Sequence, residues 1–124
     1  MKRIAGIAVC VLTLVMCAAA NAAKLSMADR ALFQATMQQS IDYATIDGAY
    51  LHLNATTGVV KKIYPAKNHV MILHMGQHFV LCTEFRNAAG KNINVDFYIA
   101  RKKQTFVVFH TAVDDRKSLM KMML

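Results

Sequence analysis

Hydrophobic residues in the first half of the chain follow a helical spacing. The apolar positions recur at Phe33, Met37, Ile41 and Ala44, and neither glycine nor proline occurs between them. Such a stripe predicts an amphipathic helix. Ser26, followed three residues later by Asp29, resembles a capping box that opens a helix. We therefore expect a helix over residues 27–44, ended by Asp47-Gly48.

From residue 48 onward the spacing changes to the alternation that is typical of strands. Turn-forming residues separate five such segments, which predict strands over residues 49–54, 59–64, 77–86, 92–100 and 105–111. If Lys102-Lys103 is the two-residue loop of the last hairpin, the expected register pairs Ile99 with Phe106, Phe97 with Val108 and Val95 with His110. Residues 66–76 fit a short buried strand and a helical turn equally well.

The chain ends in a short segment with apolar residues at helical spacing. Thr111 and Asp114 form a second capping-box pattern, which predicts a helix that runs to Leu124. Its methionines, Met120 and Met123, would ordinarily dock on the sheet. If they are exposed instead, they indicate a groove for a partner.

Together these elements predict an α+β fold. A sheet with one apolar face needs a cover, and only the helix over residues 27–44 is long enough to provide it. We expect this N-terminal amphipathic helix on an antiparallel sheet of four to five strands, with a short C-terminal helix. The arrangement resembles the cystatin-like architecture. The hairpin over residues 50–60 is also similar to the terminal hairpin of PepSY-type exported domains, a likeness that assigns no family.

The first 22 residues have the three parts of a cleavable signal peptide. Lys2 and Arg3 precede an apolar run, Ile4–Cys17, and the small residues of Ala20-Asn21-Ala22 follow it. The run is too short to span a bilayer, and no cysteine stands where a lipoprotein signal requires one. We expect a periplasmic or secreted protein without a stable membrane anchor, in which residues 23–124 form a single compact α+β domain.

Removal of the signal peptide would change the cysteine count and the charge. Of the three cysteines only Cys82 would remain, so no internal disulfide could form. The formal net charge would fall from +8 to +6 through the loss of Lys2 and Arg3. The mature domain would still be basic.

Histidine and methionine cluster in one stretch of the mature chain. The candidate metal ligands there are His69, Met71, His74, Met75 and His78. Imidazole and thioether groups suit a soft ion such as Cu(I), so copper is the alternative to the expectation that the protein holds no cofactor. On a strand, residues 71 and 75 face one side and residue 74 the other, so one ion would reach all of them only across a turn. The alternative interpretation places the methionines in the core.

Cys82 and His110 are the residues that a small thiol-dependent or histidine-dependent enzyme would use. Cys82 lies among apolar residues in a predicted strand, whereas a nucleophilic cysteine needs an exposed, electropositive setting. The sequence therefore favours a structural thiol. It also lacks the serine elbow, the phosphate-binding glycine loop and the zinc-protease helix motif.

Basic residues form two clusters, Lys61, Lys62 and Lys67 in the first and Arg101, Lys102 and Lys103 in the second. Such clusters would suit an anionic envelope component or an envelope or extracellular protein partner. Nucleic acid is a poor match because the chain has no tryptophan and few aromatic residues near the lysines. The alternative is that the lysines protect strand edges from pairing.

These observations favour a binding, inhibitor or accessory module without enzymatic activity. The alternatives are a copper-binding envelope protein that uses residues 69–78 and a small thiol-dependent or histidine-dependent enzyme.

Overall fold

The computed structural model describes residues 25–66 and 70–123. The expected signal peptide, Lys67 and His69 lie outside these residues. Two helices and seven strands follow in the order α1 (Met27–Tyr43), β1 (Thr45–Ile46), β2 (Ala49–Asn54), β3 (Val59–Pro65), β4 (Met71–Met75), β5 (His78–Arg86), β6 (Asn92–Lys102), β7 (Thr105–Val113) and α2 (Arg116–Met123). Among the described residues, no helix is long and apolar enough to cross a membrane.

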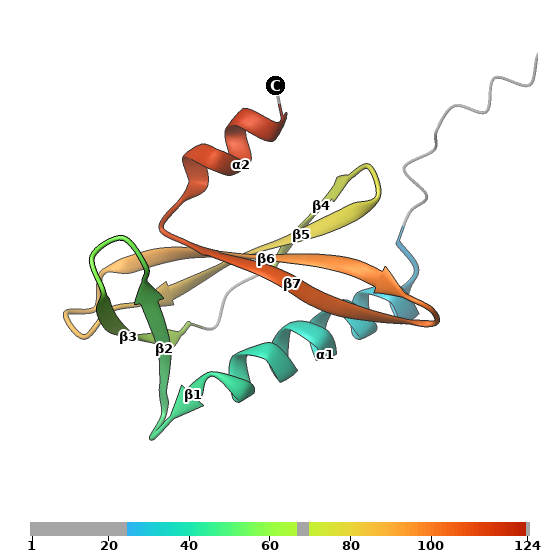
Figure 1. Cartoon of the computed structure of the whole chain (residues 1–124). Coiled ribbons are helices and arrows are strands. Elements are labelled where there is room, and N and C mark those ends of the chain that lie inside the picture. Colours follow the sequence, from blue (N-terminus) through green and yellow to red (C-terminus); the bar gives the residue numbers. More distant parts are fainter. Residues whose placement is uncertain (1–24, 67–69, 124) are drawn as a thin grey trace, which may run out of the picture.

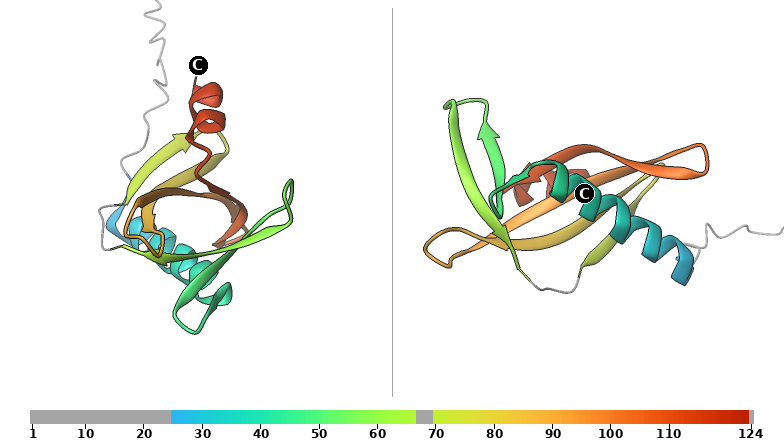
Figure 2. Two further views of the ribbon diagram at one scale, coloured as in Figure 1. Left: turned by 90° about the vertical axis from the view of Figure 1, so that its left-hand side faces the viewer. Right: turned by 90° about the horizontal axis from the view of Figure 1, so that it is seen from below.

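The seven strands form one antiparallel sheet with the order β1-β2-β3-β5-β6-β7, and β4 also pairs with β5. β3 pairs with one end of β5, at Phe85 and Arg86, whereas β4 pairs with the other end, from His78 to Cys82. The sheet curls into a half-barrel (Figures 1 and 2). About half of the described residues lie in strands. The prediction of an α+β, cystatin-like domain with a four-to-five-stranded sheet is therefore wrong.

The inner face of the curled sheet holds the larger core. α1 begins at the predicted Ser26, whose hydroxyl accepts a hydrogen bond from the Asp29 amide at 3.0 Å. Phe33, Met37 and Ile41 point from the helix onto the sheet and are buried. The sheet contributes the alternate side chains of its central strands, among them Leu81, Phe85, Val95, Phe97, Ile99 and Phe106. The helix lies along this inner face (Figure 2).

The outer face of the sheet is buried in part as well, which the expectation of a single apolar face did not include. The side chains that alternate with the inner core residues, Val80, Cys82, Tyr98 and Ala112, form a second cluster with Leu119 of α2. α1 and α2 thus lie on opposite sides of the sheet (Figure 1). Because both faces of the central strands need cover, the short C-terminal helix is part of the architecture and not an appendage.

Two turns differ from their predicted roles. Asp47 and Gly48 have φ angles of 52° and 79° and join β1 to β2, where Ile46 pairs with Ala49. A two-residue hairpin turn with positive φ at both positions favours this dipeptide. The helix ends earlier, with Ala44 as its C-cap. In the last hairpin, the loop residues are Lys103 and Gln104, because Lys102 pairs with Thr105.

The shifted loop and a β-bulge overturn the expected register of the last hairpin. Ile99 pairs with Val108, but the preceding Tyr98 pairs with His110, so Phe109 is an extra residue in β7. Phe97 consequently pairs with Thr111 and Val95 with Val113. The bulge places the consecutive residues Phe109 and His110 against Tyr98, on the outer face. The alternation rule alone puts consecutive residues on opposite faces.

The inner core generates a direct stability prediction at Phe33. This side chain is fully buried, with ring centroids 4.7 Å from Phe79 and 4.5 Å from Phe106. Phe33→Ala should lower the free energy of unfolding by about 3–5 kcal/mol, because it leaves a cavity between helix and sheet. Leu32→Ala is the matched control, since Leu32 is 42% exposed. Denaturant unfolding of both variants checks the difference, and equal losses would contradict this packing.

Candidate functional site

Aromatic side chains gather on the outer face of β5, β6 and β7, beside α2. The ring of His78 is stacked on Tyr98 at 6.0 Å and meets the edge of Phe109 at 5.7 Å. His110 contacts Tyr98 in an edge-on arrangement, with centroids 5.3 Å apart. Phe109 remains 55% exposed. These rings therefore make up an aromatic surface outside the inner core.

α2 forms one wall of a groove over this surface. The groove has a volume of about 410 Å³ and is lined by His78, Tyr98, Phe109, His110, Ala112, Asp115, Ser118 and Met122. We refer to it as the α2 groove. Asp115, Ser118 and Met122 are spaced so that they share one side of the helix. The rings of the sheet provide the floor.

The start of α2 differs from the capping box predicted at Thr111 and Asp114. Thr111 lies in β7, and Asp115 takes the capping role at the helix start. The carboxylate of Asp115 accepts a hydrogen bond from the Ser118 amide at 3.4 Å and from the Ser118 hydroxyl at 2.9 Å. These bonds hold the carboxylate at the edge of the groove.

A buried ion pair attaches α2 to the sheet. Asp96, on the outer face of β6, is 1% exposed. The Arg116 guanidinium donates two hydrogen bonds to it, from Nε to Oδ2 at 3.1 Å and from Nη2 to Oδ1 at 2.9 Å. Two such hydrogen bonds fix the orientation of the guanidinium relative to the carboxylate as well as the distance between the two groups. Because Arg116 is the first residue of α2, this contact positions the wall of the groove.

Two carboxylates lie near the aromatic floor of the groove, although the chain as a whole is basic. Burial raises the pKa of Tyr98, and the carboxylates of Asp96 and Asp115 raise it further, while Arg116 acts in the opposite direction. The phenol of Tyr98 therefore stays protonated at neutral pH. Asp96 is paired with Arg116, and Asp115 is the carboxylate that lines the groove.

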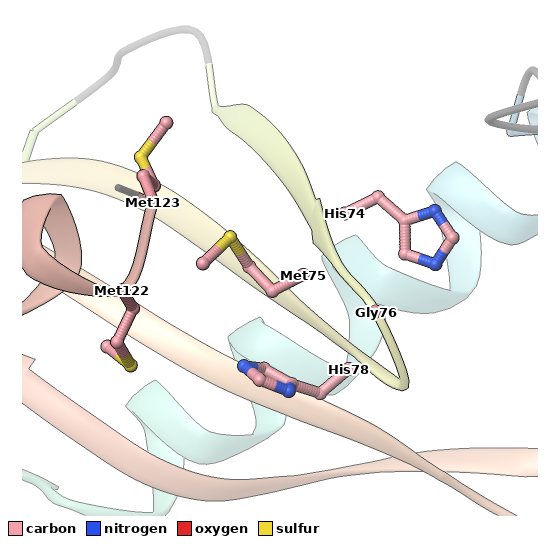
Figure 3. Close-up of a pocket in the computed structure, with 6 residues that line it drawn as sticks. All are labelled: His74, Met75, Gly76, His78, Met122 and Met123. Carbon is pink, nitrogen blue, oxygen red and sulfur yellow. The ribbon is translucent and has the colours of Figure 1, made fainter.

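A second pocket adjoins the α2 groove and shares His78 and Met122 with it. Its volume is about 570 Å³, and it is lined by His74, Met75, Gly76, His78, Met122 and Met123. We refer to it as the methionine pocket (Figure 3). Met120 and Met123, which were expected to dock on the sheet, are instead 59% and 56% exposed, and Met122 is 52% exposed.

The structure separates the residues that the sequence suggested as copper ligands. Met75 and His78 pair directly across the β4–β5 turn and lie on the outer face. His74 extends to the other side of β4 and is stacked on Phe79, with centroids 4.6 Å apart. Met71 pairs with Cys82 farther along the strand, and His69 lies outside the described residues. Within the described chain, no group of three or more His, Cys, Asp or Glu side chains could hold a metal ion.

Cys82 lies in an environment that stabilises the protonated thiol. Burial raises its pKa to about 12, and the neighbouring carboxylate of Asp96, to which the thiol donates a hydrogen bond, adds to the shift. Cys82 and Asp96 are paired residues of β5 and β6. A nucleophilic thiolate needs the opposite surroundings. The structure pairs Cys82 with a carboxylate, whereas the enzyme hypothesis required a histidine.

The two basic clusters lie far apart. Lys61 and Lys62 are exposed on β3, whereas Arg101 and Lys102 end β6 and Lys103 lies in the following turn. The β2–β3 hairpin and the β6–β7 turn are at opposite ends of the molecule (Figures 1 and 2). The guanidinium of Arg101 is also placed over the Phe106 ring at 4.6 Å. The described residues of the two basic clusters therefore do not form one continuous recognition surface.

Sequence reasoning missed most of the residues that line the α2 groove. The candidates did not include Tyr98, Phe109, Asp115 and Met122. The bulge that turns Phe109 and His110 to the same face has no simple sequence signature. The one usable signal was the occurrence of two phenylalanines and one histidine within five residues of β7, in Phe106–His110.

Comparison with protein-family models, with curated proteins and with solved structures finds no match to this chain.

The raised pKa of Cys82 predicts slow thiol chemistry. At pH 8 a sulfhydryl reagent should label Cys82 slowly in the native protein and rapidly after denaturation, which mass spectrometry can follow. The unfolded chain loses this proton near the ordinary pKa of 9.0, but the folded one only near 12. The associated stability is therefore complete below pH 9 and is lost as the pH rises toward 12.

The matched variant for the pH dependence is Cys82→Ala. The stability difference between the native protein and this variant should shrink above pH 9, because only the native sequence carries the titrating thiol. Rapid native labelling at pH 8, or a difference that is constant from pH 8 to 11, would contradict the assignment.

Proposed function

We propose that the protein is a binding module that takes a small organic cation in the α2 groove. The observation that carries the proposal is the β-bulge in β7, which turns Phe109 and His110 to the same face as Tyr98 and His78. Bulges are frequent at binding sites, where they re-aim side chains. Here the bulge adds rings to a surface that the inner core does not use.

The chemistry of the groove favours a positively charged ligand with apolar substituents. Aromatic faces attract cations through their quadrupoles, and Tyr98 and Phe109 supply such rings. Asp115 adds a carboxylate at the edge of the groove, where it attracts a positively charged group. The volume of about 410 Å³ is in the range of small-molecule sites.

This proposal deepens the binding-module prediction and moves its site. The sequence suggested the lysine clusters as recognition surfaces, whereas the groove is aromatic and carries the carboxylate of Asp115. The surroundings of Cys82 support binding over thiol chemistry. Export of the protein, and contact of its basic clusters with an anionic envelope component or a protein partner, remain predictions from the sequence.

Two quaternary ammonium compounds test the proposal by NMR titration. Choline and benzyltrimethylammonium should shift the resonances of Tyr98, Phe109 and His110 in a saturable manner. The uncharged isostere of choline, 3,3-dimethylbutan-1-ol, should bind about tenfold more weakly, because it lacks the charge that the rings and Asp115 attract.

Variants locate the binding in the groove. Phe109→Ala and Asp115→Asn should each weaken binding about three- to tenfold, the loss expected for one cation–π or charged contact. Tyr43→Ala is the matched control, since Tyr43 is 93% exposed on α1 and should leave binding unchanged. The proposal fails if neither ammonium compound shifts these resonances, or if the neutral isostere binds equally well.

A further inference from the structure

We propose that the methionine pocket binds one Cu(I) ion through Met75, His78 and Met122. This site overlaps the organic-cation site at His78 and Met122, whereas Met75 belongs to the methionine pocket alone. It also differs from the ligand set that the sequence suggested. That set lay within residues 69–78, whereas here one ligand comes from α2.

Strand pairing brings the first two ligands together. The β4–β5 hairpin turns at Gly76 and Gln77, so Met75 and His78 are directly opposite each other. Opposed residues in an antiparallel pair have Cβ atoms about 4.5–5.5 Å apart, on the same face of the sheet. The turn thus removes the obstacle noted for a single strand, on which neighbouring ligands face opposite sides. The backbone of Gly76 has a φ of 72°, which glycine adopts readily.

The third ligand comes from the last turns of α2. Leu119 and Arg116 fix this helix on the outer face, and Met122 and Met123 then reach the same pocket as Met75 and His78. In Figure 3 the side chains of Met75, Met122 and His78 extend into a common space, and Met123 lies at its rim. His74 extends away from that space, on the far side of β4.

The donor set selects a soft monovalent ion. Thioethers are poor ligands for hard ions such as Mg²⁺ and Ca²⁺, and together with imidazole they suit Cu(I). A zinc site normally uses histidine, cysteine or carboxylate ligands, and the described residues include no such group of three or more. The thiol of Cys82 does not compete for the ion, because it is buried and donates a hydrogen bond to the Asp96 carboxylate.

The imidazole of His78 is held in place and its nitrogens are available. Stacking on Tyr98 and the edge contact with Phe109 orient the ring. No described residue hydrogen-bonds either ring nitrogen of His78. Met122 is 52% exposed and Met75 is partly exposed, so an ion can reach the pocket from solvent. Few side chains need to be displaced before the ion binds.

Competition with a coloured Cu(I) chelator measures the affinity directly. The purified protein, kept anaerobic with a reductant, should withdraw one equivalent of Cu(I) from bicinchoninate. Loss of one ligand should weaken Cu(I) binding at least about tenfold, because loss of a residue that only hydrogen-bonds to a metal ligand already has an effect of that size. The variants that test this are Met75→Leu, Met122→Leu and His78→Gln. The methionine replacements conserve volume and should preserve the fold.

Three control variants separate this site from the alternatives. His74→Gln tests the ligand set suggested by the sequence and should leave the Cu(I) affinity unchanged, as should Met71→Leu. Met27→Leu, at an 85% exposed position on α1, tests for binding by any surface methionine and should also have no effect. X-ray absorption of the copper complex should show both sulfur and nitrogen scatterers.

The outcomes also separate this proposal from the organic-cation site. Asp115→Asn should bind Cu(I) like the native protein, and Met75→Leu should bind choline like the native protein. The copper proposal is overturned if the protein removes no Cu(I) from bicinchoninate, or if the Met75, His78 and Met122 variants retain the native affinity. Loss of affinity in His74→Gln to the same degree would overturn it equally.

Discussion

The ion pair between Asp96 and Arg116 is the contact on which the outer half of the molecule depends. Asp96 is 1% exposed, and both of its carboxylate oxygens accept hydrogen bonds from one guanidinium. A buried carboxylate without a partner destabilises the folded protein. The folded state is therefore most stable when Arg116 is paired with Asp96. α2 has only eight residues and would be marginal alone. The pair and the buried Leu119 therefore decide where the helix lies.

The position of α2 determines both candidate sites. Its side with Asp115, Ser118 and Met122 closes the α2 groove, and its last residues reach Met75 and His78 in the methionine pocket. The inner face of the same sheet is filled by α1 and aromatic side chains, so its contribution is to the stability of the fold. The two faces of the curled sheet thus have different roles. Its inner face holds the fold together, and its outer face presents aromatic, imidazole and thioether groups.

Local sequence patterns predicted the elements better than their assembly. The spacing of Phe33, Met37 and Ile41 and the Ser26 cap indicated α1 because both depend on residues close in sequence. Asp47-Gly48 was taken as a helix end, although the same dipeptide is a strong hairpin signal, and β1 was missed because it has only two residues. The four-to-five-stranded α+β prediction failed mainly because it assumed that only one face of the sheet is covered. The apolar residues Val80, Cys82 and Tyr98 indicate that the other face of the sheet is covered as well. A run of apolar residues does not, however, reveal which element covers each face.

The candidate sites depend on contacts between distant segments, which no local pattern encodes. The pairing of Asp96 with Arg116 spans twenty residues, and Met75 and Met122 line a common pocket only because α2 is docked. The bulge at Phe109 shifts the register of half a strand and changes which face His110 occupies. The histidine and methionine content did indicate soft-metal chemistry, but the strand geometry removes His74 from the ligand set and brings in Met122.

Hydrogen exchange at α2 tests most directly whether the Asp96–Arg116 pair holds this helix on the sheet. In Arg116→Met, the amides of Leu119 to Met123 should lose protection, while those of β5 and β6 remain protected. Lys117→Met, which changes the exposed neighbouring residue, should exchange like the native protein. Equal protection of α2 in the native protein and in Arg116→Met would contradict the account.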